Sequence, residues 1–516
     1  KISMKSYDAV VIGSGHNGLV AACYLAKAGK SVLVLEKSAS LGGATTSVKA
    51  FKGVDAKLSR YSYLVSLLPD QIIKDLSLNF ETIGRKVSSY TPYFDGESDK
   101  GLLINSDFDQ ESRDSLSELT EGDDEAIAWE SFYRSIKEFA EVVAPTMLEP
   151  VPTESEIKEL VDPLTWVELV ENTLAQSLND NFFDDLVKGV VLTDGLIGTF
   201  TSADDHLANK CFIYHVIGNS SGQWRVPKGG MGVLVDQLLI RAKQLGVEIV
   251  ASQEVTSITQ GDNNLLIQTQ DGKSYKAKVA LANCAPRVLE RITDFKAPPL
   301  RDGSQVKINM VLRELPKLKS GADPKVAFAG TFHVNESYFE LEQAFAQASL
   351  GQIPDVIPSE LYCHTLTDST ILHPDLIAAG YQSLTLFALH LPASLFDKDH
   401  DRIKAEVSKR ILDGFSEFLE RPIESYLAKD SDGHLCIEVK TPQELEKELG
   451  LPRGNIFHSD LQFPWKQDGD SRKWGVETSS ERIFLAGAGA LRGGGVSGIA
   501  GHNAAMAALE TLARLT

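Results

Sequence analysis

A short apolar run followed by closely spaced glycines near the start of the chain constrains the fold more than any other feature. Residues 7–18 read Tyr-Asp-Ala-Val-Val-Ile-Gly-Ser-Gly-His-Asn-Gly. Val10, Val11 and Ile12 are typical of a buried parallel strand, and the stretch 19–28, rich in Ala and Leu and without proline, is typical of a helix. The glycines therefore mark a turn from strand to helix.

There is a physical reason for a glycine at each of three positions in this turn. Gly13 permits the tight turn out of the strand, Gly15 lets the backbone approach a pyrophosphate, and Gly18 lets helix and strand pack closely. A second apolar strand ends at Glu36, about 20 residues beyond the glycine loop. A carboxylate there accepts hydrogen bonds from ribose hydroxyls and repels a 2′-phosphate, so we expect FAD or NAD and exclude NADP.

A second glycine pair narrows this choice. Gly42 and Gly43, followed by Ala44, come directly after the second strand. They resemble the glycine pair of the two-dinucleotide-binding flavoproteins, in which the backbone holds the FAD pyrophosphate at a second place. The sequence therefore predicts FAD, the alternative being a glycine-rich turn in an ordinary α/β domain.

Length and charge limit the other possibilities. At 516 residues the chain exceeds one typical domain, and its net charge of -20 argues against nucleic-acid binding and against electrostatic capture by anionic lipid. Five scattered cysteines form no CxxC pair, which excludes a redox-active disulfide and fits a reducing compartment. We find no run of about 18 apolar residues. We expect a cytoplasmic protein that does not span a membrane, and leave peripheral contact with a membrane surface open.

The order of strand and helix patterns predicts an α/β protein with a discontinuous Rossmann-like FAD-binding domain, a mixed-sheet substrate domain and a helical cap. The FAD domain is expected in three parts, 1–90, 219–300 and 478–516, and the substrate domain in two, 91–106 and 301–477. Helical patterns over 107–218 predict the cap. The acidic run 107–125 matches no metal-binding loop, so we expect a solvated face there and no metal site.

The C-terminal segment, 478–516, repeats the order of strand, glycine loop and helix seen in the first segment. A strand near 482–486 ends in glycines, among them Gly487 and Gly495, and an Ala-rich helix follows from about Ile499. A glycine loop that leads into a helix N-terminus is an anion site. Facing a flavin, it would stabilise negative charge on the reduced ring.

Three motifs together resemble the bacterial phytoene desaturase and carotenoid oxidoreductase family: residues 13–22, 227–232 and 493–505. Residues 59–68 and 454–461 look like the subgroup named for a pyridine nucleotide-disulfide oxidoreductase domain. The resemblance implies a helical cap over an apolar tunnel. It also implies that Gly13, Gly15, Gly18, Glu36, Gly42 and Gly43 hold the ADP half of FAD. Further cofactor residues are expected at Ser14, His16, Asn17, Lys37, Ala44, Val255 (through its backbone, at the adenine), Gly487, Gly495 and Val496.

The leading functional hypothesis is hydride transfer between a C-H bond of a hydrophobic, polyene-, carotenoid- or lipid-like substrate and flavin N5, in a desaturase, saturase or isomerase acting on CH-CH bonds. No catalytic constellation can be assigned from spacing. Arg225 and His458 are the candidates for groups near the flavin, with a structural hydrogen bond as the alternative for each. Two other functions remain open: an FAD-dependent amine or small-molecule oxidase, and a flavin-binding protein without turnover.

Overall fold

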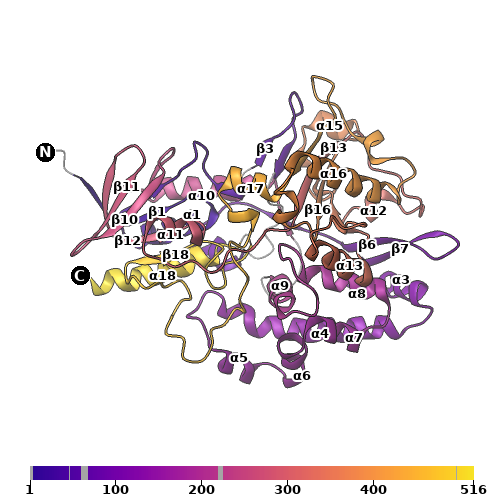
Figure 1. The fold of residues 1–516 in the computed structure, drawn as a ribbon, viewed down its shortest axis with the longest axis horizontal. Coiled ribbons are helices and arrows are strands. Elements are labelled where there is room, and N and C mark those ends of the chain that lie inside the picture. Colours follow the sequence, from indigo (N-terminus) through magenta and orange to yellow (C-terminus); the bar gives the residue numbers. More distant parts are fainter. Residues whose placement is uncertain (1–3, 46, 60–67, 219–224, 496) are drawn as a thin grey trace.

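Two seven-stranded sheets and a helical cap make up the fold (Figure 1). The computed structural model describes residues 4–45, 47–59, 68–218, 225–495 and 497–516. The first sheet lies beside both chain termini, and the second lies at the opposite end of the molecule with the cap helices below it. No helix in these ranges is both long and apolar enough to cross a bilayer.

The first sheet joins strands from widely separated parts of the chain, in the order β10-β11-β12-β1-β2-β9, with β18 beside β12. Strands β9, β2, β1, β12 and β18 run parallel, whereas β10, β11 and β12 pair antiparallel. This confirms the expected discontinuous Rossmann-like domain. Its strands are β1 (Lys5–Ile12), β2 (Val32–Leu35), β9 (Glu248–Val250), β10 (Val255–Gln260), β11 (Leu265–Thr269), β12 (Ser274–Ala282) and β18 (Ile483–Leu485).

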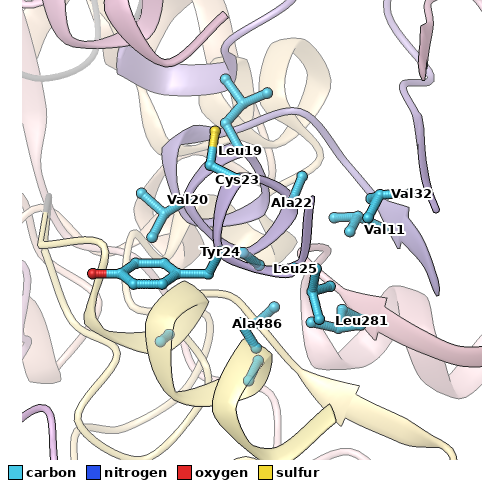
Figure 2. Close-up of a cluster of buried hydrophobic side chains, with 14 of the residues drawn as sticks. Val11, Leu19, Val20, Ala22, Cys23, Tyr24, Leu25, Val32, Leu281 and Ala486 are labelled. Atoms are coloured by element: carbon cyan, nitrogen blue, oxygen red, sulfur yellow. The ribbon is translucent and has the colours of Figure 1, made fainter. Parts of the chain in front are cut away.

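Both faces of the first sheet are buried. On one face, Val11 and Val32 pack with α1 (His16–Lys27), α10 (Gly232–Gln244) and α18 (Ile499–Arg514). Figure 2 shows α1 at the centre of this cluster, with Leu25 beside Leu281 of β12. On the other face, Val10 and Ile12 pack with β10, β11 and α11 (Pro286–Ile292). The apolar run of β1 is continuous because neither side meets water.

The second sheet has the order β17-β13-β16-β15-β14-β6-β7. Only β14 and β6 pair in parallel. Because β6 begins at Val87, the boundary expected at residue 90 falls inside this strand. The strands are β6 (Val87–Phe94), β7 (Asp99–Asn105), β13 (Val306–Leu312), β14 (Thr331–Val334), β15 (Ser359–Tyr362), β16 (Gln382–Ala388) and β17 (Ile437–Lys440).

Side chains alternate between the two faces of this second sheet. One face is apolar: Ile308, Phe332 and Leu386 pack with Phe415 of α16 (His400–Ser416) and with α12 (Pro324–Ala327). The other face is turned toward the cap and the first sheet, as the contacts described below show.

The cap is helical, as expected, and its aromatic side chains fill its own core. Trp129 and Phe132 of α4 lie 6.2 and 5.4 Å, centroid to centroid, from the ring of Phe182, and Phe132 lies 6.3 Å from Phe212. These rings are packed against one another. The helices are α3 (Gln110–Thr120), α4 (Asp124–Val143), α5 (Glu154–Leu160), α6 (Pro163–Trp166), α7 (Leu174–Asn181), α8 (Asp185–Leu192) and α9 (His206–Ile217), and α13 (Tyr338–Ser349) packs on α8.

Short elements connect the three parts. Two small sheets pair β3 with β4 and β5 with β8. The bounds of the remaining strands and helices are β3 (Ser47–Lys49), β4 (Lys57–Ser59), β5 (Thr82–Gly84), β8 (Arg225–Pro227), α2 (Asp70–Asp75), α14 (His364–Thr367), α15 (Pro374–Ala378) and α17 (Pro442–Leu449).

Candidate functional site

The first glycine loop lies at the carboxyl end of β1, where parallel sheets bind ligands. Gly13 has φ of +98°, and its N-H donates to the Leu35 carbonyl at 2.8 Å. A Cβ on Gly18 would lie 2.2 Å from the Gly13 carbonyl oxygen, so only glycine fits this crossing. Gly15 caps α1 without a side chain, which leaves the first N-H groups of the helix available to an anion.

The second glycine pair lies against the first loop. Gly42 forms a parallel bridge with Gly15, and its N-H donates to Ser14 Oγ at 3.1 Å. A Cβ on Gly43 would lie 3.3 Å from the Gly15 Cα, and Gly43 and Ala44 begin the short 3₁₀ turn 43–45. Two backbone segments without side chains thus form one cradle of the kind that a dinucleotide pyrophosphate requires.

Glu36 lies beside this cradle and is held by it. Its Oε1 accepts hydrogen bonds from the N-H and hydroxyl of Ser14 at 2.9 and 2.7 Å, and its Oε2 accepts from the Ser38 N-H at 2.8 Å. These bonds fix the carboxylate at the end of β2. Lys37, by contrast, is exposed, with its Nζ 3.6 Å from Glu254.

Val255, the residue expected at the adenine, begins β10 next to the end of β2. The Gln253 N-H, two residues earlier, donates to the Glu36 carbonyl at 2.7 Å. The structure thus brings Val255 and Glu36 to the same edge of the sheet, where the adenosine half of FAD would lie.

The C-terminal glycine loop meets the first loop. Asn17 Oδ1 accepts from the Gly501 N-H of α18 at 3.2 Å, and a Cβ on Gly501 would lie 2.1 Å from the Asn17 carbonyl oxygen. Gly498, with φ of +68°, caps α18 without a side chain. The N-termini of α1 and α18 therefore lie beside one another, and Ile499 and Gly501 of α18 already donate their N-H groups, to Ser497 Oγ at 3.2 Å and to Asn17 Oδ1.

His16 lies between the two loops. Burial lowers its pKa to about 4, although the nearby Gly495 backbone favours the charged form, so the imidazole is neutral at pH 7. Its Nδ1 lies 3.2 Å from Thr45 Oγ1, and its buried Nε2 has no hydrogen-bond partner among the described residues. An unpartnered buried nitrogen facing a glycine cradle fits a bound polar ligand such as FAD. Val496 lies outside the described residues.

Asn283 is a site residue that sequence reasoning missed. Its N-H donates to the Ile12 carbonyl at 2.8 Å. Its side chain would lie 3.0 Å from a Cβ on Gly15, 2.7 Å from one on Gly18 and 3.1 Å from one on Gly487. Cys284 follows Asn283 in the same turn. Burial raises the pKa of Cys284 to about 12, so its thiol is inert.

Arg225 is engaged in structure. Its Nε donates to Thr82 Oγ1 at 2.7 Å and one terminal nitrogen donates to the Thr82 carbonyl at 2.8 Å, which ties β8 to β5. For this residue the described contacts favour the structural alternative over acid-base work.

His458 lies near the C-terminal loop. His458 adopts φ of +65°. A Cβ added to Gly489 would lie 3.5 Å from the Cβ of His458. Burial lowers its pKa to about 4, and its Nδ1 has no hydrogen-bond partner among the described residues. A left-handed conformation and an unmatched nitrogen next to a cofactor loop are features of functional sites.

The face of the second sheet turned toward the cap and the first sheet carries two rows of polar side chains; we call it the polar face. In the first row the strand register aligns Lys307, Phe387, Glu360 and His333. In the second row it aligns Glu438, Asn309, Thr385 and Tyr362. Apart from Glu438, which is partly exposed, all of these residues are buried.

The polar face reaches the cofactor side of the molecule. Lys307 Nζ donates to the Ser59 carbonyl of β4 and lies 5.4 Å from the centre of the Phe387 ring. Ser59 Oγ in turn accepts from the Met231 N-H at 3.3 Å, at the start of α10. A small cavity lined by Ser59, Val226 and Thr385, among others, separates the face from β4 and β8.

Two further features lie near these elements. A cavity of about 500 Å³ reaches Gly494 and Ser497 of the C-terminal loop; its wall is mixed, with apolar residues such as Met147 and Leu148 beside Asp70, Asp75 and Glu149. Separately, His333, Glu336 and Glu360 place their ligand atoms within 4.8 Å of one another, although the sequence led us to expect no metal site.

Comparison with known proteins agrees with this geometry. The family model described as flavin containing amine oxidoreductase matches residues 18–369. An uncharacterized protein of Mycobacterium tuberculosis is 40% identical over 99% of this chain and 98% of its own. Pyridine nucleotide-disulfide oxidoreductase domain-containing protein 2 of Rattus norvegicus is 27% identical over 97% and 92%.

Among solved structures, cyclohexylamine oxidase from Brevibacterium oxydans shares the fold with a TM-score of 0.56, at 15% identity over 99% of each chain. The match to the rat protein agrees with the subgroup resemblance noted in the sequence. With its two glycine loops and their cradle, the chain is an FAD-dependent oxidoreductase that belongs to the flavin containing amine oxidoreductase family.

Proposed function

We propose that this protein oxidises a C-H bond next to an amine or another polar group of a small organic substrate. The observation that carries the proposal is the polar face. Polar side chains favour a ligand that can return their hydrogen bonds, which hydrocarbon cannot do. A surface with Lys307 and Thr385 is therefore poorly suited to an apolar polyene, and well suited to a substrate with hydrogen-bonding or charged groups.

The expected contributions of the chain follow from its geometry. The two glycine loops would hold FAD, which supplies the hydride acceptor at flavin N5. The uncapped N-terminus of α18 would stabilise negative charge that develops nearby. The polar face would orient the substrate, and the packed cap would exclude water. Neutral His458 has no charge to offer at pH 7, but can accept or donate a hydrogen bond.

The leading hypothesis from the sequence, CH-CH oxidation of a polyene- or lipid-like substrate, is the second candidate. The apolar part of the larger cavity's wall, which includes Met147, Leu148 and Ile217, favours it, because this cavity reaches the C-terminal glycine loop. A volume of about 500 Å³ suits one drug-sized ligand, since such pockets measure roughly 300–1,000 Å³.

Anaerobic titration of the purified flavoprotein distinguishes these candidates. A panel of primary and secondary amines and, separately, a carotenoid precursor are added while absorbance at about 450 nm is followed. We expect an amine to bleach the flavin. Bleaching by the polyene alone would replace the first proposal with the second, and a flavin that no compound reduces would favour a binding protein without turnover.

Two substitutions test whether the substrate binds at the polar face. Thr385→Val and Lys307→Met should raise the amine concentration needed for half-maximal bleaching by about tenfold or more, because each removes a polar contact worth about 1.4 kcal/mol or more. Lys409→Met, which alters an exposed lysine of α16, is the matched control and should leave the titration unchanged. An unchanged titration in all three variants would remove the polar face from the substrate site.

A further inference from the structure

A cluster of three ionisable side chains is sealed between the second sheet and the cap. His333 of β14 and Glu360 of β15 stand opposite each other in the strand register. Glu336 follows β14, directly before the Ser337 capping box that starts α13. The side chains of His333, Glu336 and Glu360 are 4%, 0% and 1% exposed. Helix α8 closes the site, since a Cβ on Gly189 would lie 1.9 Å from the Glu336 carbonyl oxygen.

The distances in this cluster match those of a coordination shell. His333 Nδ1 lies 2.8 Å from Glu336 Oε1 and 4.0 Å from Glu360 Oε2, and one ligand atom from each residue falls within 4.8 Å of the other two. Zinc binds nitrogen and carboxylate oxygen at about 2.0–2.2 Å, so in a tetrahedral site two ligands lie about 3.4 Å apart. The 4.0 Å separation of His333 Nδ1 and Glu360 Oε2 is within about 1 Å of this value.

Two carboxylate oxygens point to a missing partner. Glu336 Oε2 and Glu360 Oε1 are buried and accept no hydrogen bond from the described residues. The ion pairs that these residues make within the described part of the chain are with His333. Tyr362 hydrogen-bonds to the Glu360 carboxylate, and Arg85, whose guanidinium lies 5.6 Å over the Tyr362 ring, acts on it electrostatically, but the Oε1 atom of Glu360 still has no partner among the described residues. A buried carboxylate without a partner is strongly unfavourable, so the orphaned oxygens need either protons or a cation.

A third acid adds to the negative charge. Asp194, in the 3₁₀ turn after α8, interacts electrostatically with both Glu336 and Glu360. Burial raises the pKa of Asp194, Glu336 and Glu360 above their usual values, and the neighbouring acids raise the pKa values of Glu336 and Glu360 further.

We propose that His333, Glu336 and Glu360 bind one divalent transition-metal ion, with Zn²⁺ as the best fit, and that this ion ties β14, β15 and the start of α13 together. One imidazole nitrogen and two carboxylates give the mixed N and O donor set that Zn²⁺ and its neighbours accept. Two carboxylates neutralise a divalent charge. Asp194 supplies the negative surroundings, and the proton shared by His333 and Glu336 leaves to solvent on binding.

An organic ammonium group is the competing occupant. It would need room to enter with the rest of its molecule. Neither of the two cavities described above has His333, Glu336 or Glu360 in its wall. A single ion fits this enclosure better than a substrate does. The metal proposal is thus independent of the proposed function.

The test is the metal content of the purified flavoprotein, measured by mass spectrometry, followed by removal with EDTA and titration with ZnCl₂ in a calorimeter. We expect about one ion per chain and saturable rebinding. Glu360→Gln and Glu336→Gln, which keep side-chain volume, should each reduce bound metal to about a tenth or less. Asp401→Asn, at the exposed pair with His400, is the control and should retain the metal.

Thermal unfolding gives a second readout that needs no enzyme activity. Zn²⁺ should raise the unfolding temperature of the EDTA-treated protein by several degrees and leave that of Glu360→Gln unchanged. Absence of metal together with no calorimetric binding of Zn²⁺ or Mn²⁺ would overturn the proposal and leave a protonated cluster. Equal binding by the wild type and by both glutamine variants would overturn it as well, since the metal would then lie elsewhere.

Discussion

The two seven-stranded sheets bury their strands in opposite ways. Every side chain of β1 from Ala9 to Ile12 is buried, and helices or further strands cover both faces of the first sheet with apolar groups. In the second sheet Ile308 and Leu386 pack on α16, whereas their neighbours Lys307 and Thr385 belong to the polar face. The first sheet therefore leaves a ligand only its strand ends, whereas the second carries polar side chains across one of its faces.

The largest loss of FAD binding and stability is expected from a substitution at Gly18, where the structure leaves no room for a side chain. Gly18→Ala should abolish FAD binding and destabilise the fold by about 3 kcal/mol, because the new Cβ would lie 2.2 Å from the Gly13 carbonyl. The 450 nm absorbance and denaturant unfolding measure both effects. Gly122→Ala has open space around its Cβ and is the matched control. Full flavin content in Gly18→Ala would show that the close backbone contact at this position is not needed for FAD binding.

Two neighbours on β16 test the two faces of the second sheet. Leu386→Ala should cost about 2–5 kcal/mol of unfolding free energy, since this side chain is fully buried in the apolar face. Thr385→Val should cost about 1 kcal/mol, through loss of its 3.3 Å hydrogen bond to Asn309 Oδ1. Chemical denaturation measures the unfolding free energy of both variants. Similar losses in both variants would mean that the polar face contributes to stability as a core does.

The smallest effect concerns pH. Burial raises the pKa of Asp194 to about 7, so the folded state retains a proton that the unfolded state has lost above about pH 4. The stability contributed by this group is therefore complete below about pH 4 and declines as pH rises toward 7. With EDTA present, the unfolding temperature of Asp194→Asn should fall by about 2 °C less than that of the wild type between pH 5 and 8. An unaltered slope would show that Asp194 ionises freely.

The first sheet could be predicted from sequence because its signals are local. The glycines, the strand before them and the helix after them lie within 7–28, and backbone geometry dictates their roles. Glu36 and Gly42 follow within the same motif. The C-terminal loop repeats the pattern, so its place in the FAD domain could be expected.

The polar face could not be predicted in this way. Lys307, Glu360 and His333 become neighbours only through the register of strands far apart in sequence. The same holds for Asn283, whose side chain meets glycines from both ends of the chain. Arg225 and His458 were chosen from their motifs, but the hydrogen bonds of Arg225 to Thr82 and the backbone strain at His458 depend on tertiary contacts.

The crossing of α1 and α18 determines when this protein can become functional. Asn17 and Gly501 touch across 484 positions of chain, and Leu25 of α1 shares a cluster with Ala504 and Ala508 of α18. During synthesis α1 emerges first, and its partner helix becomes available only after the 484 positions that separate them have been made. Until then the part of its apolar surface that faces α18 has no cover and the cofactor cradle lacks one wall. Loss of the last turns of α18 would therefore leave a nascent-like state, prone to aggregation and to chaperone capture, even with the first glycine loop unchanged.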